Sequence, residues 1–258
     1  MRTEDMVGLL VPLTYFLMLA IERRRPARSF PRRKGWAWMG VAFLVVLGTV
    51  STVVPLALDP DWLVAHRWLD GTRLGVAGGV IVGWIALSGM TYLVHRTFHA
   101  SDWLWPLTHQ LHHSPQRVDI SGSVLFHPVE MVLSTLVQLF VTVIVLGLDP
   151  LAAALVGYVQ AFHGMFQHWN VHTPRWLGYV VQRPESHCEH HRLGVHANNY
   201  ADLPLWDLLF GTFRNPATFE GACGFESPAD RRLWAILGFR DVNRPLYGPS
   251  SRGERRTA

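Results

Sequence analysis

Histidines are concentrated in one stretch of this chain, and their spacing is regular. Of the 14 histidines in the sequence, 12 lie between His95 and His191, and ten of those belong to four tight clusters. Two clusters have the spacing HxxxH and two have the spacing HxxHH. They comprise His95 and His99; His109, His112 and His113; His168 and His172; and His187, His190 and His191. A pattern in which each of two spacings occurs twice is not expected by chance and indicates a shared role.

The spacings are those of metal ligands on helices. Residues three and four positions apart lie on the same face of an α-helix, so each cluster can direct its imidazoles toward one point. Neutral imidazole is a good ligand for zinc, copper, nickel and iron. Ten imidazoles exceed the four ligands that one zinc ion usually takes, and they suit two ions of higher coordination number. A lone histidine is more often structural than a ligand, but four clusters in repeated register favour metal binding.

The composition indicates a membrane protein. The 258 residues are 49% hydrophobic and only 16% charged, well below the charged fraction of about 25% in soluble domains. The two cysteines, Cys188 and Cys223, form no CxxC motif and no disulfide framework, which fits a reducing cytoplasm. The sequence contains no glycine-rich nucleotide motif, P-loop or haem-attachment motif. No feature favours nucleic-acid binding, since the arginine cluster is explained by anionic lipid.

The first apolar run, Met6–Ile21, is followed by a basic segment and no small-residue cleavage site. It therefore reads as a membrane anchor and not as a cleaved signal peptide. A hydrocarbon core of ~30 Å needs about 20 residues, so flanking side chains must extend this run. Four further runs are 36–58, 74–94, 129–148 and 151–166, and the last two form a hairpin. The sequence thus predicts an all-α, integral-membrane helical bundle of four to five spans, in preference to a soluble protein with large buried helices.

The distribution of positive charge predicts the orientation of these spans. The loop from Glu22 to Gly35 holds seven Lys/Arg residues, whereas the loop from Asp59 to Arg73 holds only Arg67 and Arg73. By the positive-inside rule the first loop is cytoplasmic. Alternation of the spans then brings every histidine cluster to the cytoplasmic face, and this argument does not use the histidines.

Three regions follow from these patterns. Residues 1–94 hold the N-terminal spans and the basic loop. Residues 95–248 hold the metal-binding core, with a membrane hairpin at 129–166 and a histidine-rich cytoplasmic cap that includes a weak helix near 229–237. Residues 249–258 are expected to form a disordered tail.

Several segments around the histidines resemble one known family. The segments are Thr108-His-Gln-Leu-His-His113, His127-Pro-Val-Glu130, Asn199-Tyr200 and Leu205-Trp-Asp-Leu-Leu-Phe-Gly-Thr-Phe213. With the histidine clusters, they resemble the fatty acid hydroxylase superfamily, which comprises integral-membrane di-iron enzymes such as sterol desaturases and C-4 methylsterol oxidases. The resemblance covers roughly residues 95–213. Ala201 departs from it, because many members have glycine there, and this bears on a loop conformation and not on the metal site.

The resemblance implies a site and a set of supporting residues. All ten clustered histidines would be ligands of two iron ions, with zinc as a substitute in purified protein, and the partition between the two ions stays open. Carboxylates, amides and further histidines would support the ligands from outside the coordination sphere. The candidates for this role are His127, Glu130, His163, Asn170, Glu189, His196, Asn199 and Asp207.

The resemblance also implies an activity. A di-iron oxygenase would use O₂ and external electrons to hydroxylate an unactivated C–H bond of a lipid such as a sterol, hopanoid, carotenoid or fatty acyl chain; hydroxylation is favoured over desaturation. The chain has no flavin, haem or iron–sulfur motif, so electrons would come from a ferredoxin, rubredoxin or cytochrome b5-like donor. The expected location is a bacterial inner membrane, with the metal site on the cytoplasmic face.

Two other classes of function are weighed against the oxygenase. A zinc-dependent membrane hydrolase would need the glutamate of an HExxH motif, but Arg96 follows His95 and Trp169 follows His168. A metal-binding or transport protein would need ionisable residues within its spans. Only His163 and Glu130 come near that requirement, so the oxygenase is favoured.

Overall fold

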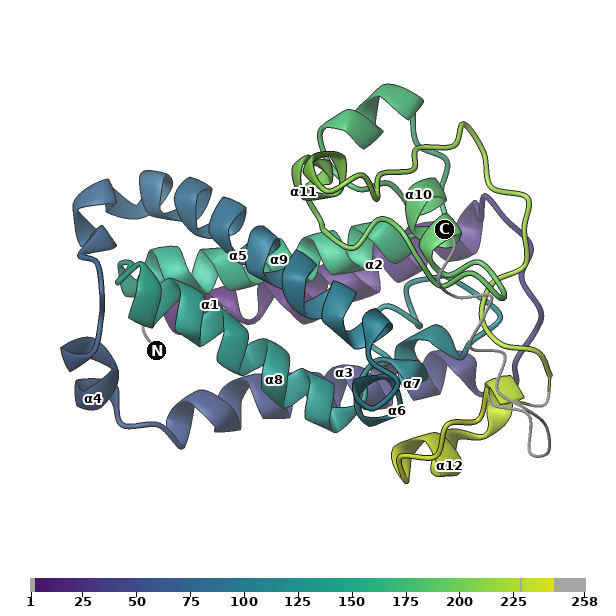
Figure 1. Cartoon of the computed structure of the whole chain (residues 1–258), viewed down its shortest axis with the longest axis horizontal. Coiled ribbons are helices and arrows are strands. Elements are labelled where there is room, and N and C mark those ends of the chain that lie inside the picture. Colours follow the sequence, from purple (N-terminus) through teal and green to yellow (C-terminus); the bar gives the residue numbers. More distant parts are fainter. Residues whose placement is uncertain (1–2, 228, 244–258) are drawn as a thin grey trace.

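The computed structural model describes residues 3–227 and 229–243, and within them the chain is helical (Figure 1). The long helices are α2 (Leu10–Arg24), α3 (Trp36–Leu56), α5 (Gly75–Ala100), α8 (Pro128–Leu139) and α9 (Pro150–His168). A π-helical turn, η2 (Phe140–Val145), continues α8. The one β-type pairing among the described residues is an isolated bridge between Arg192 and Cys223. The predicted all-α fold is confirmed.

The apolar runs become helices whose starts are marked by capping residues. The side chain of Asp149 accepts hydrogen bonds from the amides of Leu151 and Ala152, and Pro150 occupies the first turn of α9. His127 caps α8 in the same way, with Pro128 following it. Proline is favoured at this position because its missing N–H would have no partner inside the helix.

Three described helices are long and apolar enough to cross a membrane: Trp36–Leu56, Gly71–Ala100 (η1, Gly71–Leu74, with α5) and Pro128–Val145. The predicted count of four to five spans is therefore not confirmed. The two other predicted spans differ from these in length and polarity. At 15 residues, α2 is about 22 Å long, shorter than a hydrocarbon core of ~30 Å. The helix α9 is long enough, but it carries Gln160, His163 and Gln167.

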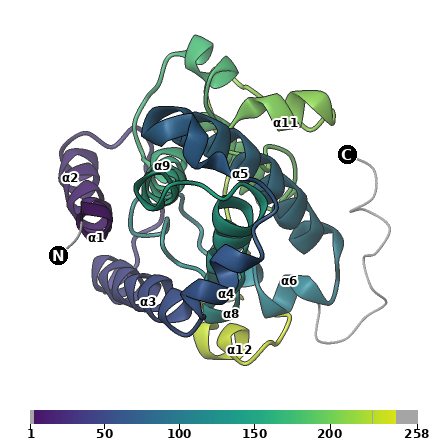
Figure 2. The ribbon, with the colours of Figure 1, turned by 90° about the vertical axis from the view of Figure 1, so that its left-hand side faces the viewer.

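Seen along the bundle, α9 lies between α2 and α5, while α8 lies between α3 and α5 (Figure 2). The contact between α5 and α9 is made close by small residues. A Cβ atom at Gly83 would lie 2.7 Å from Val156, so the two backbones approach each other only because glycine occupies this position.

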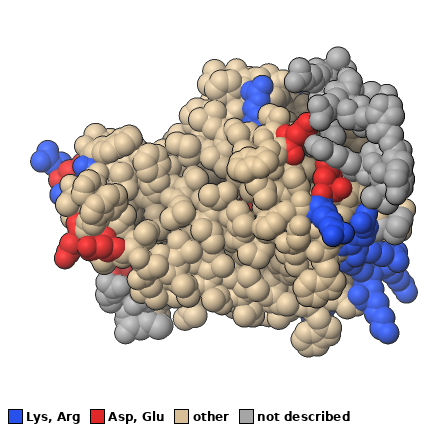
Figure 3. Space-filling model, turned by 60° about the horizontal axis from the view of Figure 1, so that its bottom comes forward, with Lys and Arg blue, Asp and Glu red and all other residues tan. Residues whose placement is uncertain are grey.

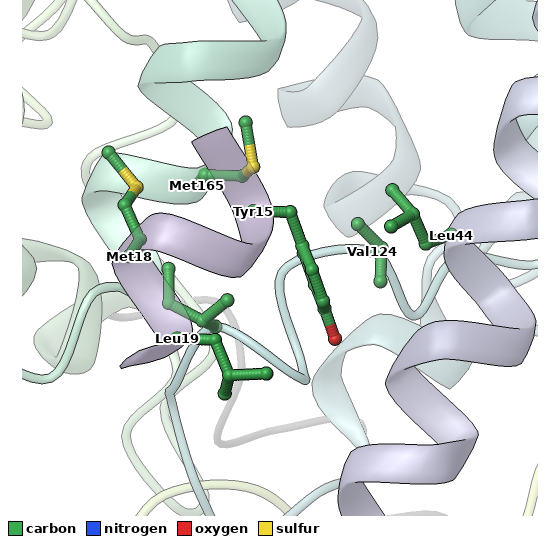
Figure 4. Close-up of a cluster of buried hydrophobic side chains, with 7 residues drawn as sticks. Tyr15, Met18, Leu19, Leu44, Val124 and Met165 are labelled. Atoms are coloured by element: carbon green, nitrogen blue, oxygen red, sulfur yellow. The ribbon is translucent and has the colours of Figure 1, made fainter. Parts of the chain in front are cut away.

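The helix α2 is fixed to the bundle by both apolar and polar contacts. Figure 4 shows Tyr15 of α2 lying between Met165 of α9 and Val124 in a shared apolar cluster. One turn beyond this cluster, the buried Glu22 carboxylate accepts hydrogen bonds from the backbone amides of Ile120 (3.0 Å) and Asn170 (2.9 Å). The N-terminal run therefore belongs to the same packed unit as the later helices.

On the face shown in Figure 3, charged residues gather toward the two ends of the molecule and leave a broad, largely uncharged belt between them. The basic loop lies at the end that carries the histidines, as predicted. The amide of Ala27 donates to the carbonyl of Asn170 at 2.9 Å, and Arg28 pairs with Glu185 at 3.0 Å. This arrangement fits a membrane around the belt.

Short helices at the histidine end form a cap. They are α6 (Leu104–Leu107), α7 (Gln110–His113), η3 (Arg175–Tyr179), α10 (Pro184–His190), α11 (Pro204–Leu209), η4 (Ala229–Arg231) and α12 (Leu233–Leu237). The last two fall in the predicted weak helical segment. The short helices α1 (Thr3–Val7) and α4 (Pro60–Ala65) complete the described elements. The predicted disordered tail, 249–258, lies outside the described residues.

Candidate metal centre

Nine of the ten clustered histidines come together in two groups at the start of the cap. Within each group, one ring nitrogen of every member lies within 4.8 Å of those of the others. The first group contains His95, His99, His109, His113 and His190. The second group contains His112, His168, His187 and His191.

The two HxxHH clusters divide their members between the groups. In α7, His109 and His113 join the first group and His112 joins the second. In α10 the assignment is reversed, because His187 and His191 join the second group and His190 joins the first. In each helix the residues four apart act together, and the remaining histidine, turned by about 100°, faces the other group. The two short helices thus connect both groups.

The helices of the bundle supply the other ligands. His95 and His99 lie one turn apart near the end of α5, and His168 is the last residue of α9. The rings of His113 and His191, one from each group, stack with centroids 4.0 Å apart. The two groups are therefore immediate neighbours.

The ring nitrogens within a group are spaced as metal ligands are. The Nε2 atom of His168 lies 3.1 Å from Nε2 of His112 and 3.2 Å from Nε2 of His187. In the first group, Nε2 of His99 lies 3.2 Å from Nε2 of His95. Two nitrogens bound at about 2.1 Å to one ion are separated by about 3.0–3.4 Å when they are adjacent in octahedral or tetrahedral geometry. The observed spacing matches this range.

Three other ring nitrogens of the first group have no hydrogen bond within the described part of the chain. The Nε2 atoms of His109, His113 and His190 have no hydrogen-bond partner among the described residues. An unpaired buried polar atom costs about 1–3 kcal/mol, which makes three in one cluster unfavourable for a purely structural site. A metal ion would accept the lone pairs of all of them, so the residues present fit a metal ion.

Backbone carbonyl groups orient several of these rings. The Nδ1 atoms of His95, His168 and His190 donate to the carbonyl groups of Tyr200 (2.7 Å), Gly164 (2.8 Å) and Asn198 (2.6 Å). A proton held at Nδ1 leaves Nε2 as the unprotonated nitrogen that faces the group. The carbonyl group of Tyr200 is a backbone group, which every residue has, so the residue type does not mark this contact.

The carboxylate of Glu130 performs the same task for His109. Its Oε1 atom lies 2.6 Å from Nδ1 of His109, and both side chains are buried. This contact places Glu130 where the sequence analysis expected a supporting residue. Glu189, the other candidate glutamate, instead forms a two-pronged ion pair with Arg192.

We expect Glu130→Gln to weaken metal binding by about 10–100-fold, because a partner of a ligand histidine raises its basicity and fixes its orientation. The matched control is Glu189→Gln, which removes a charge from the cap without touching a ring. Competition of each variant with a coloured chelator gives the affinity. Equal losses in the two variants would contradict the assigned role of Glu130.

The loop that supplies two of these carbonyl groups has an unusual backbone. His196, Asn198 and Asn199 all have positive φ, at 45°, 68° and 50°. The side chain of Asn199 holds this conformation by donating to the Ser186 carbonyl (2.9 Å) and by accepting from a backbone amide at 214 (2.7 Å). Strain of this kind persists only where surrounding contacts enforce it.

Asp207 braces the next part of the same loop. Its buried carboxylate accepts hydrogen bonds from the amides of Tyr200 (2.9 Å) and Ala201 (3.0 Å). The backbone of Ala201, where many members of the family have glycine, is therefore held in place by Asp207. His196, in turn, places Nδ1 at 3.0 Å from Nδ1 of His113.

The remaining candidates lie away from both groups. His127 caps α8, His163 stacks on Trp84 with ring centroids 4.8 Å apart, and Asn170 holds the basic loop through the backbone of Arg28. His172 is exposed and lies beyond the end of α9. Neither group includes His172.

Sequence reasoning passed over Arg183, which comes directly before α10. Its side chain is completely buried, pairs with Glu185 at 3.0 Å and donates to the carbonyl of Thr173 at 2.9 Å. Further bonds reach the segment 215–217. A single arginine in a sequence with many carries no signal of such burial.

Burial lowers the pKa of the cap histidines well below the ordinary value of 6.5, and neighbouring histidines add to the effect; these residues are His109, His112, His113, His187, His190 and His191. Each imidazole is therefore neutral at physiological pH. A neutral ring offers its lone pair without competition from a proton.

We expect the metal-free protein to lose stability in acid. Between the lowered pKa of each histidine in the folded protein and its unfolded value of about 6.5, the unfolded chain binds more protons. The free energy of unfolding therefore decreases as the pH is lowered through this range. The contribution is fully present above about pH 6.5. Burial raises the pKa of Glu22 and of Asp202 to about 7 and also raises the pKa of Asp207, which acts in the opposite direction, but these are three groups against six.

Thermal unfolding of the chelator-treated protein at pH 8, 7, 6 and 5 checks this prediction. The melting temperature should be level between pH 8 and 7 and should fall below pH 6.5. Asp202→Asn should make the fall steeper, since it removes one of the opposing groups. A melting temperature that stays level down to pH 5 would contradict the assignment of neutral buried rings.

Comparisons with known proteins agree with this geometry. Residues 80–212 match the fatty acid hydroxylase family. Ornithine lipid hydroxylase OlsE of Rhizobium tropici is 33% identical over 189 residues, which are 69% of this chain and 54% of that protein. Sphinganine C4-monooxygenase 1 of Arabidopsis thaliana is 24% identical over 178 residues, which are 67% of this chain and 68% of that protein. The chain thus spans about half the length of the first relative, and no solved structure matches it.

Proposed function

The chain belongs to the fatty acid hydroxylase family, and from this premise we propose that it is a membrane-bound di-iron oxygenase that hydroxylates a lipid. The single observation that carries the proposal is the pair of adjacent histidine groups, in each of which the ring nitrogens converge to within 4.8 Å of one another. Both groups consist of histidines, with no carboxylate base among the described residues of either, and this favours iron and oxygen chemistry over hydrolysis.

In this proposal, the five histidines of the first group hold one ion and the four of the second group hold the other. Bound iron would supply the activation of O₂ and of the C–H bond, with electrons from outside the chain. The protein holds the ligands in place. The carbonyl groups of Tyr200, Gly164 and Asn198 and the Glu130 carboxylate keep a proton at Nδ1 of four rings, so that Nε2 remains free.

The position of the site suits a lipid substrate. His95 and His168 lie near the ends of two long apolar helices, α5 and α9, on the side from which the chain enters the cap. A lipid with its chain in the membrane and its head group near water would bring its upper methylene groups to this level. Burial of the histidines excludes bulk water from the reacting carbon.

We further propose that the substrate is an acyl-chain lipid that bears an amino group. The two relatives are named for an ornithine lipid and for sphinganine, and both compounds combine a long alkyl chain with an amine. Of the lipid classes considered from the sequence, this supports a fatty acyl chain over a sterol, hopanoid or carotenoid.

The electron donor and the orientation complete the proposal. A ferredoxin, rubredoxin or cytochrome b5-like protein would deliver electrons at the cap. We propose that the metal centre lies on the cytoplasmic side of a bacterial inner membrane. The basic loop shares the end of the molecule that carries the histidines, and by the positive-inside rule this supports the orientation.

The test is lipid analysis of cells that express the chain, compared with cells that express a His168→Ala variant. Growth under heavy-isotope O₂ should yield a lipid heavier by one labelled oxygen atom in the first strain only. Anaerobically purified protein should hold about two irons per chain.

Other outcomes would lead elsewhere. A lipid that gains oxygen from water, or that is cleaved, would replace the oxygenase with a hydrolase. Loss of two hydrogen atoms without gain of oxygen would indicate desaturation. A folded protein without bound metal would overturn the proposal.

A further inference from the structure

The cap carries an apolar surface that the proposed reaction does not use. It is formed by η3 and α11, and we call it the cap patch; its residues are Trp176, Tyr179, Leu205, Leu208, Leu209 and Phe210. All six side chains are exposed, with Leu209 at 67% and Trp176 at 65%. A contiguous cluster of large apolar side chains on the surface indicates an interaction site.

The polar side of α11 is turned inward. Its one acidic residue, Asp207, is fully buried and bonded to the amides of Tyr200 and Ala201. The outward face presents Leu205, Leu208 and Leu209 without a charge. The segment is therefore amphipathic, with its apolar face outward.

The helix α11 lies beside α5 and not beyond its end (Figures 1 and 2). A Cβ atom at Gly89 would lie 2.7 Å from the ring of Trp206, so the indole rests directly on the backbone of α5. The ring of Phe210 stacks on Tyr92 with centroids 5.1 Å apart. These contacts place α11 alongside residues 88–92 of α5.

That stretch of α5 lies within a candidate membrane span, 71–100. Twenty residues, the length that crosses a hydrocarbon core of ~30 Å, extend from Gly75 to Val94. At 1.5 Å per residue, residues 88–92 then lie about 3–9 Å inside the boundary on the histidine side. Helices embedded in a membrane interface have a similar depth, about 5–10 Å.

The outer face of α5 continues the same apolar surface. Ile81, Ile85 and Leu93 are exposed along the span, and the segment that carries the cap patch packs on the same helix at Gly89 and Tyr92. Arg175, the first residue of η3, and Arg214, which follows α11, are both exposed, and arginines beside a lipid-facing surface interact with anionic head groups. Trp176 and Tyr179 are of the types enriched at membrane interfaces.

We propose that η3 and α11 are embedded in the membrane leaflet on the histidine side, with the cap patch against acyl chains. The continuity of the patch with the lipid-facing surface of α5 identifies the occupant as the leaflet. Behind the patch, Tyr92 contacts Tyr200, whose ring centroid lies 5.4 Å from that of His95. The rings of Tyr92 and Tyr200 thus lie between acyl chains at the patch and the first histidine group. The inference does not depend on the reaction proposed above.

The test measures the depth of a nitroxide spin label in the full chain, reconstituted in phospholipid nanodiscs. Labels are attached through Leu209→Cys in the patch, Thr218→Cys on an exposed part of the cap and Ile81→Cys on α5. The native Cys188 and Cys223 are buried, and the unsubstituted chain provides the labelling background. Accessibility to O₂, which concentrates in lipid, is compared with accessibility to a water-soluble nickel chelate.

We expect the ratio of O₂ to nickel accessibility at position 209 to match that at 81 and to exceed that at 218 several-fold. A ratio at 209 equal to that at 218 would overturn the proposal. A second outcome would also overturn it: both reagents are excluded from position 209, and the spectrum shows dipolar broadening that disappears when unlabelled chain is added. That result would identify a second copy of the chain as the occupant. Leu205→Cys provides a second patch position if the first variant does not fold.

Discussion

His168→Ala is expected to remove the metal ion of the second group and to lower product formation at least about 100-fold, whereas His172→Ala leaves both intact. Both residues are histidines of the same HxxxH cluster, so the two substitutions remove the same side chain. His168 is buried with Nε2 at 3.1 Å and 3.2 Å from two other Nε2 atoms. The helix α9 ends at His168, so the relation between residues four apart in a helix does not extend to His172.

Metal content by mass spectrometry and lipid analysis of the same two strains check this prediction. A melting curve in detergent shows that each variant is folded. Loss of metal from both variants in equal measure would mean that His172 is a ligand and that the division of histidines between the groups is wrong. Retention of both metals in His168→Ala would remove His168 from the second group.

Arg183→Ala is expected to destabilise the protein by about 3–5 kcal/mol, because it leaves the buried carboxylate of Glu185 short of one partner. The guanidinium group also fixes the start of α10, which carries two of the nine grouped histidines and is followed directly by a third, His191. Metal binding should therefore weaken together with stability.

The matched control for this variant is Arg192→Ala at the other end of α10. Arg192 is partly exposed and pairs with Glu189, so its loss should cost only about 0–1 kcal/mol. Denaturant unfolding in detergent measures both values. A double variant with Arg183→Met and Glu185→Gln should recover only part of the loss, since position 185 is then neutral but Arg28 loses its ion pair there. Equal stability of the two single variants would contradict the role assigned to Arg183.

Local features of the sequence were sufficient for the fold class and the family. Five apolar runs without internal charges predict helices at the places where the structure has them. They did not suffice for the number of spans. The run at 151–166 was predicted to be a span, but the helix α9 carries Gln160 and His163 and packs between α2 and α5. That packing depends on the other helices and cannot be read from one segment.

The sequence by itself determined which side chains could bind metal, because the spacing of HxxxH and HxxHH is a local property of a helix. Only the tertiary structure decided how these histidines divide between two groups. That division depends on how α7 and α10, 70 residues apart in the chain, are turned toward α5 and α9.

The tertiary structure likewise decided which groups hold the rings. The carbonyl groups of Tyr200, Gly164 and Asn198 are backbone groups, which every residue has, so no residue type marks them. Arg183 and the cap patch are further examples, because burial and exposure depend on segments distant in sequence. Spacing along one helix is readable from the chain, whereas contact between helices exists only once they have packed.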